Sequence, residues 1–253
     1  MPDRVLVAVA HGSTDPRASA TIEELIAIAR ERAEERAVES GRSAPVLRTA
    51  YLGHAAPSLP QVMNTIGPGA EVTVLPLLLT AAYHSKTDIP RELARTSLRA
   101  ERVSYGAPLG PHPLLLRALR RRLTEEDPAG DRSRTGVVLA AAGSSDPEAN
   151  ATIARLAAQW QARDGWLAVR PAYASASDPT PAAAVAGLLA AGASRVVVAS
   201  YLLAPGFFAD RIKNASLAAG AAAVSPVLGA SAEVADVLLD RYEEAGTRQR
   251  AAA

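Results

Sequence analysis

The chain has 253 residues, a net charge of +1 and no cysteine. The lack of cysteine excludes disulfides, thiolate metal ligands and a cysteine nucleophile. The balanced charge argues against a dedicated nucleic-acid binder, which would carry a basic face. We see no signal peptide and no apolar run long enough to span a bilayer, so we expect a cytoplasmic protein that does not bind membranes.

The first half of the chain alternates predicted strands with predicted helices. Residues 4–10 form an apolar run typical of a strand that is covered on both faces of a parallel sheet. A helix of about 25 residues follows from Asp15-Pro16 and ends at Gly41, with one buried stripe at helical spacing. Further strands are predicted at 46–52, 71–79 and 102–105. One further helix is predicted to end near residue 66, and two others to span 90–99 and 113–123. This alternation predicts a parallel sheet with helices on both faces.

The same order of elements recurs in the second half. The strand and turn at 5–16 reappear at 137–147, with Ala142 in the place of His11. Other matched blocks pair 48–51 with 170–173, 72–79 with 196–203, and 108–110 with 227–229. We therefore predict an α/β fold of two similar domains, each a four-stranded parallel sheet flanked by helices, related by internal duplication with a cleft between them. We place the domains at 1–124 and 136–246, with a polar linker at 125–135 and a disordered tail at 247–253.

All four histidines lie in the first half, at positions 11, 54, 84 and 112. The matched positions of the second half carry none, which favours a site built once. His11 and His84 each follow a predicted strand, at the edge where open α/β sheets bind ligands. Imidazole binds divalent Co, Fe, Ni or Zn, and it accepts a proton near neutral pH. Each histidine taken alone can also be a hydrogen-bonded loop residue, but the pair favours function.

The other polar loop residues have two interpretations each. His54 follows the second strand and can point to the same cleft, whereas His112 stands between two prolines, where a helix-entry role is expected. The Gly12-Ser13 turn can bind an anion with its amides, or it can be a tight turn and helix cap. Both copies keep Gly-Ser-x-Asp-Pro, so capping is at least part of its role. No dinucleotide or P-loop motif is present, so no nucleotide cofactor is expected.

Three motifs together carry a family resemblance. The segments His11-Gly-Ser-x-Asp-Pro16, Pro76-Leu-Leu-Leu79 and His84-x-x-x-Asp88-Ile-Pro90 resemble the class II chelatases, which are the sirohydrochlorin cobalt and iron chelatases of sirohaem and cobalamin biosynthesis. The resemblance covers nearly the whole chain. It implies a lyase that inserts Co²⁺, Fe²⁺ or Ni²⁺ into sirohydrochlorin or a related tetrapyrrole without ATP. It also implies that His11 and His84 are catalytic, by holding the metal or taking the pyrrole protons.

The chain departs from this family after the second strand. A Phe-Leu-Glu-like run is common there, but this chain has Tyr51-Leu-Gly-His54. The missing carboxylate makes His54 a candidate metal ligand beside His11 and His84. The residues expected to bind substrate are Ser13, the cations Arg17, Lys86 and Arg211, and the aromatic Phe208. The three cations can equally be solvated loop charges.

Two other functions remain open from the sequence. One is a non-catalytic tetrapyrrole or metal carrier with this fold, and the other is an unrelated α/β enzyme with a histidine acid or base. The internal duplication leads us to expect a monomer whose partner is the tetrapyrrole.

Overall fold

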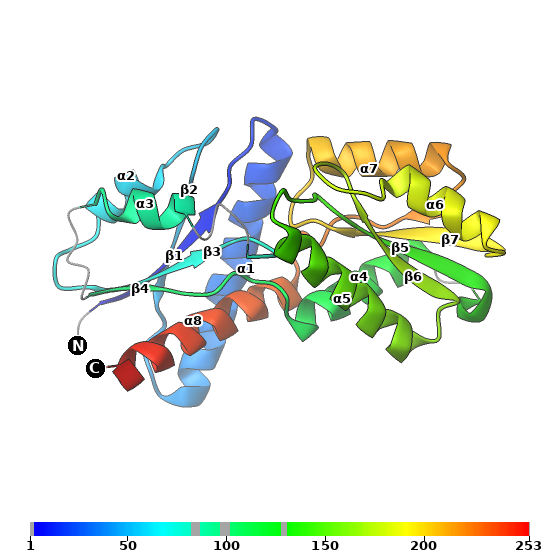
Figure 1. The fold of residues 1–253 in the computed structure, drawn as a ribbon. Coiled ribbons are helices and arrows are strands. Elements are labelled where there is room, and N and C mark those ends of the chain that lie inside the picture. The colour runs from blue at the N-terminus through cyan, green and yellow to red at the C-terminus, as the bar shows by residue number, and fades with distance from the viewer. Residues whose placement is uncertain (1–2, 82–86, 97–101, 128–130, 253) are drawn as a thin grey trace. The chain divides into compact units, whose positions relative to one another are not determined.

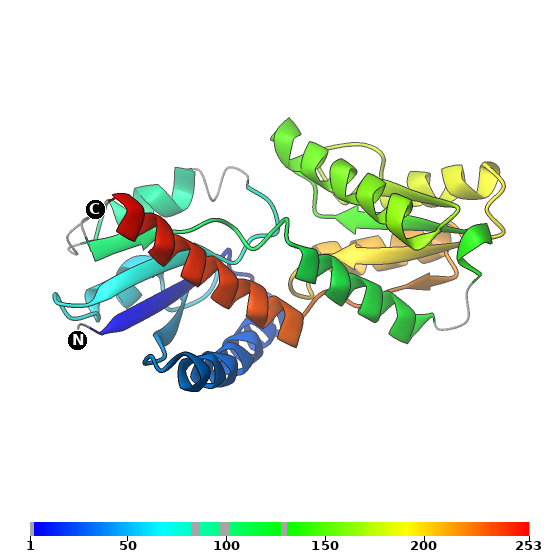
Figure 2. The same ribbon diagram turned by 90° about the horizontal axis from the view of Figure 1, so that it is seen from below.

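The computed structural model describes residues 3–81, 87–96, 102–127 and 131–252, with side chains up to residue 248. The chain forms two compact units, each around one four-stranded parallel sheet (Figures 1 and 2). Unit 1 comprises residues 1–114 and 230–253, and unit 2 comprises residues 115–229. This confirms the predicted fold of two four-stranded parallel sheets flanked by helices.

Unit 1 has the sheet order β2-β1-β3-β4. Its strands are β1 (Arg4–Ala10), β2 (Val46–Tyr51), β3 (Glu71–Pro76) and β4 (Val103–Tyr105), and its helices are α1 (Pro16–Ser40), α2 (Leu59–Asn64), α3 (Ile89–Leu93) and α8 (Ala232–Ala252). Figure 1 shows α1 and α8 on one face of the sheet and α2 and α3 on the other. The central strand β1 is buried from Val5 to Ala10, as the apolar run at 4–10 predicted.

Unit 2 repeats this arrangement with the order β6-β5-β7-β8. Its strands are β5 (Thr135–Ala141), β6 (Ala168–Tyr173), β7 (Arg195–Tyr201) and β8 (Ala223–Val224), and its helices are α4 (Pro113–Glu126), the short η3 (Arg132–Arg134), α5 (Pro147–Asp164), α6 (Pro181–Ala190) and α7 (Phe207–Ala218). The first two residues of α4 fall in unit 1. None of the helices in the described residues is long and apolar enough to cross a membrane.

The two units share their helix-capping chemistry. Asp15 caps α1 by accepting a hydrogen bond from the Arg17 amide, and Asp146 caps α5 in the same way. Each of these helices ends on a glycine in the left-handed conformation, with φ of +64° at Gly41 and +71° at Gly165. Capping by the Gly-Ser-x-Asp-Pro turn is therefore confirmed in both copies, and it fixes where the long helix starts in each unit.

The boundaries of the two units differ from those expected from the sequence. Helix α8, at the end of the chain, belongs to unit 1, whereas nearly all of α4 belongs to unit 2. The apolar periodicity of a helix shows which face is buried but not which sheet that face covers. The expected linker at 125–135 is shorter than predicted, because α4 runs to Glu126 and η3 occupies 132–134. Residues 247–252 continue α8 rather than forming a disordered tail.

Candidate functional site

Two histidines meet at the carboxyl edge of the unit 1 sheet. His11 directly follows β1, and His54 lies three residues after the end of β2. Because Ala10 lies opposite Tyr51 in the parallel pair, the chain segments after both strands leave the sheet at the same edge. The two imidazole rings are stacked, with centroids 6.4 Å apart and planes inclined by 24°. The structure thus brings together two of the three histidines expected to bind metal.

Backbone contacts hold the two histidine loops against each other. The Gly53 amide donates to the His11 carbonyl at 3.1 Å. Gly12 has a φ of +88°, and a Cβ placed on it would lie 1.7 Å from the Gly53 carbonyl oxygen. Only glycine permits so close an approach. Sequence reasoning interpreted Gly12 as part of an anion-binding turn or of a tight turn before a helix cap. It missed this close backbone contact, although the same glycine recurs in the second copy.

The second copy keeps this frame without the imidazoles. Gly143 has a φ of +86°, and a Cβ there would lie 2.0 Å from the Ser175 carbonyl oxygen. His54 and its counterpart Ala176 both have a φ of +59°. The backbone of the two edges therefore matches residue by residue, while His11 is replaced by Ala142. This supports a histidine site built in one copy.

A backbone contact of the His11 ring indicates which of its two nitrogens carries the proton. Its Nδ1 atom lies 3.1 Å from the Gly12 carbonyl oxygen. Because a carbonyl only accepts hydrogen bonds, this contact assigns the proton of the neutral ring to Nδ1. Nε2 is then the atom that carries the lone pair, which a metal ion or a proton requires.

The described residues supply only part of a metal site. No group of three or more His, Asp or Glu side chains in the described part of the chain is arranged to hold a metal ion. His84 and Lys86 lie outside the described residues, so their roles stay predictions. Strand β3 pairs with β1, with Val9 opposite Pro76, so the chain leaves β3 at the same edge of the sheet. The two strands that precede His11 and His84 are therefore neighbours, as the sequence predicted.

Ser13 and Arg17 are both tied to the helix cap. The Ser13 hydroxyl oxygen accepts a hydrogen bond from the Asp15 amide at 3.0 Å. The Arg17 guanidinium pairs with the Asp15 carboxylate at 2.6 Å, and this hydrogen bond holds the pKa of Asp15 below its ordinary value. Binding of a substrate carboxylate by Arg17 would have to compete with this ion pair, and it remains a prediction.

Phe208 and Arg211 lie in unit 2, near the start of α7 and beyond the carboxyl end of β7. The Phe207 side chain is 72% exposed and Phe208 is 38% exposed, and their rings meet edge to face with centroids 5.6 Å apart. Arg211 is exposed on the first turns of the same helix. An exposed aromatic pair suits the face of a large planar ligand. The substrate-binding roles of Phe208 and Arg211 remain predictions.

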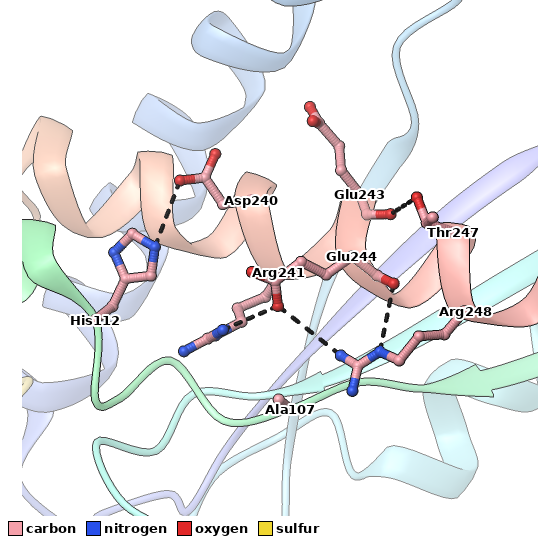
Figure 3. Close-up of a pocket in the computed structure, with 8 residues that line it drawn as sticks. All are labelled: Ala107, His112, Asp240, Arg241, Glu243, Glu244, Thr247 and Arg248. Carbon is pink, nitrogen blue, oxygen red and sulfur yellow. Dashed lines mark hydrogen bonds and ion pairs between the residues drawn. The ribbon is translucent and has the colours of Figure 1, made fainter.

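His112 has the helix-entry role that the sequence predicted. Its Nδ1 accepts a hydrogen bond from the Leu114 amide at 3.3 Å, at the start of α4. It lines a cavity of about 710 Å³ in unit 1, together with Asp240, Arg241, Glu244 and other residues of α8 (Figure 3). Burial, and then the charge of Arg241, lower the pKa of His112. Because Glu244 pairs with Arg241 at 2.9 Å and Asp240 lies 3.7 Å from His112, the charges lining this cavity largely satisfy one another.

The fold and this edge define a class of protein: a duplicated parallel α/β protein with a histidine site on one of its two sheets. The CbiX family model matches residues 5–126 and 136–245. The chain therefore belongs to the CbiX family, which confirms the chelatase resemblance found in the sequence.

Similar proteins carry chelatase names. The chain is 29% identical over 178 residues to a sirohydrochlorin cobaltochelatase of Priestia megaterium, covering 67% of this chain and 57% of that protein. It is 30% identical over 145 residues to a sirohydrochlorin ferrochelatase of Bacillus subtilis, covering 56% and 55%. The matched region thus spans little more than half the length of these curated relatives. The structure of SirB from Bacillus subtilis with Fe³⁺ superposes with a TM-score of 0.77 at 25% identity, covering 96% of this chain and 95% of that one.

Proposed function

We propose that this protein inserts Co²⁺ or Fe²⁺ into sirohydrochlorin or a related tetrapyrrole without a nucleotide. The observation that carries the proposal is the stacked His11–His54 pair at the carboxyl edge of a sheet whose duplicate has no imidazole. The names of the two curated relatives, a cobaltochelatase and a ferrochelatase, support both metals. The Fe³⁺ in the SirB structure supports a metal site in this fold. Ni²⁺ is a further candidate, because imidazole also binds it.

The reaction places two demands on the site. One dication enters the macrocycle as two pyrrole protons leave, so the site must release a metal ion and accept protons. Neutral imidazole serves both purposes, and Nε2 of His11 is the atom that carries the lone pair. We assign His11 and His84 as the catalytic pair. His54 is assigned as the ligand that stands in for the carboxylate common elsewhere in the family.

In this proposal the protein binds the macrocycle through the carboxylates at its edge and through the apolar face of its ring. We assign Ser13, Arg17, Lys86 and Arg211 to the carboxylates, and Phe208 to the apolar surface of the ring. We further propose that the protein acts in the cytoplasm as a monomer whose partner is the tetrapyrrole and not nucleic acid or a membrane.

Absorbance spectroscopy tests the activity directly. Protein, metal-free sirohydrochlorin and Co²⁺ or Fe²⁺ are mixed, and the spectral change on metallation is followed against a protein-free sample. We expect faster insertion with the protein, and a loss of most of that rate in His11→Ala and in His84→Ala. Ala142→Ser, at the matched position of the second copy, is the control and should retain the rate.

The same measurement distinguishes the alternatives. Binding of the macrocycle without faster metallation would show a carrier, and it would overturn the enzymatic proposal. Equal losses from substitutions in both halves would overturn the assignment of the chemistry to one copy.

A further inference from the structure

The loops at the carboxyl edge of the unit 1 sheet contain few acidic side chains. Four chain segments follow the parallel strands at this edge, at residues 11–15, 52–58, 77–88 and 106–112. Their sequences contain two acids, Asp15 and Asp88. Asp15 pairs with the Arg17 guanidinium at 2.6 Å. Asp88 pairs with the Arg91 guanidinium at 3.3 Å. Each carboxylate of these loops is therefore already neutralised by an arginine two or three residues further along the chain.

Gly53 lies beside His11 and brings no side chain to this edge. Its amide donates to the His11 carbonyl at 3.1 Å. In unit 2 the matched Ser175 amide donates to the Ala142 carbonyl at 2.9 Å. The Ser175 hydroxyl also donates to the Ala142 carbonyl, at 3.0 Å. Because Ala142 corresponds to His11, a side chain at this loop position reaches back to the residue that carries the imidazole in unit 1.

The backbone of unit 1 does not require a glycine at position 53. Gly53 is not among the residues with a positive φ, and a Cβ placed on it would have no atom within 4 Å. Gly12 differs, because a Cβ there would lie 1.7 Å from the Gly53 carbonyl oxygen. The fold thus has room at position 53 for a side chain that carries an oxygen ligand, and unit 1 leaves this room unused.

The metal ligands on these two loops are nitrogens. His54 directly follows Gly53, and its ring stacks on the ring of His11 with centroids 6.4 Å apart. Imidazole nitrogen suits the later divalent ions of the first transition row and Zn²⁺, whereas Mn²⁺ and Mg²⁺ suit carboxylates, carbonyls and water. At a given site the affinity of divalent ions also rises from Mn²⁺ through Fe²⁺ and Co²⁺ to Ni²⁺.

We propose that unit 1 takes its metal substrate on imidazole nitrogen without a protein carboxylate, and that it therefore selects Co²⁺ and Ni²⁺ over Fe²⁺ and excludes Mn²⁺ and Mg²⁺. This inference rests on the proposed function and narrows its choice of metals. Neutral ligands leave the full double charge on the ion, which favours its transfer to a macrocycle whose nitrogens gain negative charge as two protons leave. Zn²⁺ also suits imidazole, so we expect it to compete with Co²⁺.

Metal binding to the unsubstituted, metal-free chain tests the inference without the macrocycle. Co²⁺ is followed by its visible ligand-field absorption, Fe²⁺ by anaerobic displacement of Co²⁺, and Mn²⁺ by loss of the electron paramagnetic resonance signal of the free ion. We expect the dissociation constant for Co²⁺ to be about tenfold lower than for Fe²⁺ and about a hundredfold lower than for Mn²⁺. Binding of Fe²⁺ or Mn²⁺ as tightly as Co²⁺ would overturn the inference, and so would the absence of Co²⁺ binding.

A carboxylate introduced at position 53 tests the cause of the preference. Gly53→Glu supplies an oxygen ligand beside His11, so we expect the affinity for Mn²⁺ to rise about tenfold more than the affinity for Co²⁺. Gly53→Gln has the same size without the charge, and Ser175→Glu places the acid in the copy without imidazoles. Both controls should keep the original ratio of affinities. An unchanged ratio in a Gly53→Glu protein with the original stability in denaturant would refute the role of the missing carboxylate.

The outcomes separate this inference from the proposed function. If the protein binds Fe²⁺ and Co²⁺ equally and accelerates the insertion of both, this inference fails while the proposed function stands. If no metal binds and insertion is not accelerated, the proposed function and this inference fail together.

Discussion

His54 adopts a backbone conformation that side-chain-bearing residues rarely occupy. Its φ of +59° lies in the left-handed region, and the matched Ala176 has the same value. For a residue other than glycine this conformation costs about 1 kcal/mol or more. Because two different side chains share this conformation, the backbone frame dictates it, and the imidazole of His54 is not its cause.

A glycine at each of these two positions would separate stability from function. We expect His54→Gly and Ala176→Gly each to raise the free energy of unfolding by about 1 kcal/mol in denaturant titrations. Only His54→Gly should lower the rate of metal insertion, because Ala176 offers no ligand. Full activity in a stabilised His54→Gly protein would contradict the assignment of His54 to the metal site.

Gly12 stands at a position where the surrounding backbone leaves no room for a side chain. A Cβ there would lie 1.7 Å from the Gly53 carbonyl oxygen, and its φ of +88° disfavours any side chain. We expect Gly12→Ala to lower the free energy of unfolding by about 3 kcal/mol. Gly187, within α6, has no atom within 4 Å of an added Cβ, so Gly187→Ala should instead stabilise by about 0.5 kcal/mol. Similar effects from both substitutions would refute the close backbone contact.

His112 gives the fold a dependence on pH. Burial, followed by the charge of Arg241, lowers its pKa from 6.5, although Asp240 and Glu244 act in the opposite direction. The unfolded chain therefore binds a proton at a higher pH than the folded protein does. The stability that neutral His112 contributes is complete above pH 6.5, the pKa in the unfolded chain. It is lost as the pH falls below 6.5 and passes through the lower pKa of the folded protein.

Asparagine at position 112 removes this titration and keeps an acceptor for the Leu114 amide. We expect denaturant titrations of the original protein to show a loss of unfolding free energy as the pH falls below about 6.5. The His112→Asn protein should show a smaller loss below pH 6.5. An unchanged slope would mean that other groups cause the acid sensitivity.

At the scale of secondary-structure elements, the sequence predicted where helices and strands lie along the chain better than it predicted which sheet each helix packs against. The bounds of α1 followed from Asp15 and Gly41, because caps act through local hydrogen bonds that the sequence displays. Strand β3 ends at Pro76, earlier than the apolar run to residue 79 predicted, since apolar character alone does not mark where pairing stops. The assignment of α8 to unit 1 was not predictable, because many different amphipathic helices can cover one sheet face.

Charged and apolar contacts fix α8 to unit 1. Arg32 and Arg36 of α1 both pair with Asp236, at 2.7 and 3.1 Å. Arg241 donates to the carbonyls of Pro108 and Leu109 at 2.9 and 3.2 Å. Ion pairs that remain partly exposed to solvent contribute little to stability. Most of the stabilisation of α8 therefore comes from its apolar residues, among which Val234 and Leu238 are fully buried.

Matched leucines on α4 and α8 test which helix stabilises which unit. Leu119 and Leu238 are both fully buried. We expect Leu238→Ala, near the end of the chain, to lower the stability of unit 1 by about 3 kcal/mol, and Leu119→Ala to do the same to unit 2. Amide exchange should accelerate in β1 for the first variant and in β5 for the second. The reverse pattern would show that each helix covers the sheet of its own half.

At the scale of the whole molecule, helix α4 ends the first half of the chain but belongs to unit 2, and helix α8 ends the second half but belongs to unit 1. We call this arrangement the helix exchange, and matched contacts accompany it in both units. Arg241 on α8 reaches the carbonyl of Leu109, in the loop before α4. Arg122, the matched residue on α4, lies 3.5 Å from the carbonyl of Leu228, in the loop before α8. Each terminal helix therefore contacts the loop that precedes the other one. The duplication visible in the sequence thus extends to the contacts, whereas the histidine site was confined to one copy.

The helix exchange makes the two halves of the chain mutually dependent. A fragment of residues 1–127 has all four strands of unit 1 but lacks α8, and a fragment of residues 131–253 lacks α4. Each fragment alone exposes the sheet face that the missing helix covers, so we expect neither to unfold cooperatively at the temperature of the intact protein. Mixed in equal amounts, the two should form a 1:1 complex that unfolds cooperatively and regains metal insertion. Light scattering gives the stoichiometry, and calorimetry gives the transition. If fragment 1–127 folds alone as a monomer with the stability of the intact protein, then α8 is not needed to cover the sheet of unit 1. That result would contradict the proposed dependence of each unit on a helix from the other half of the chain.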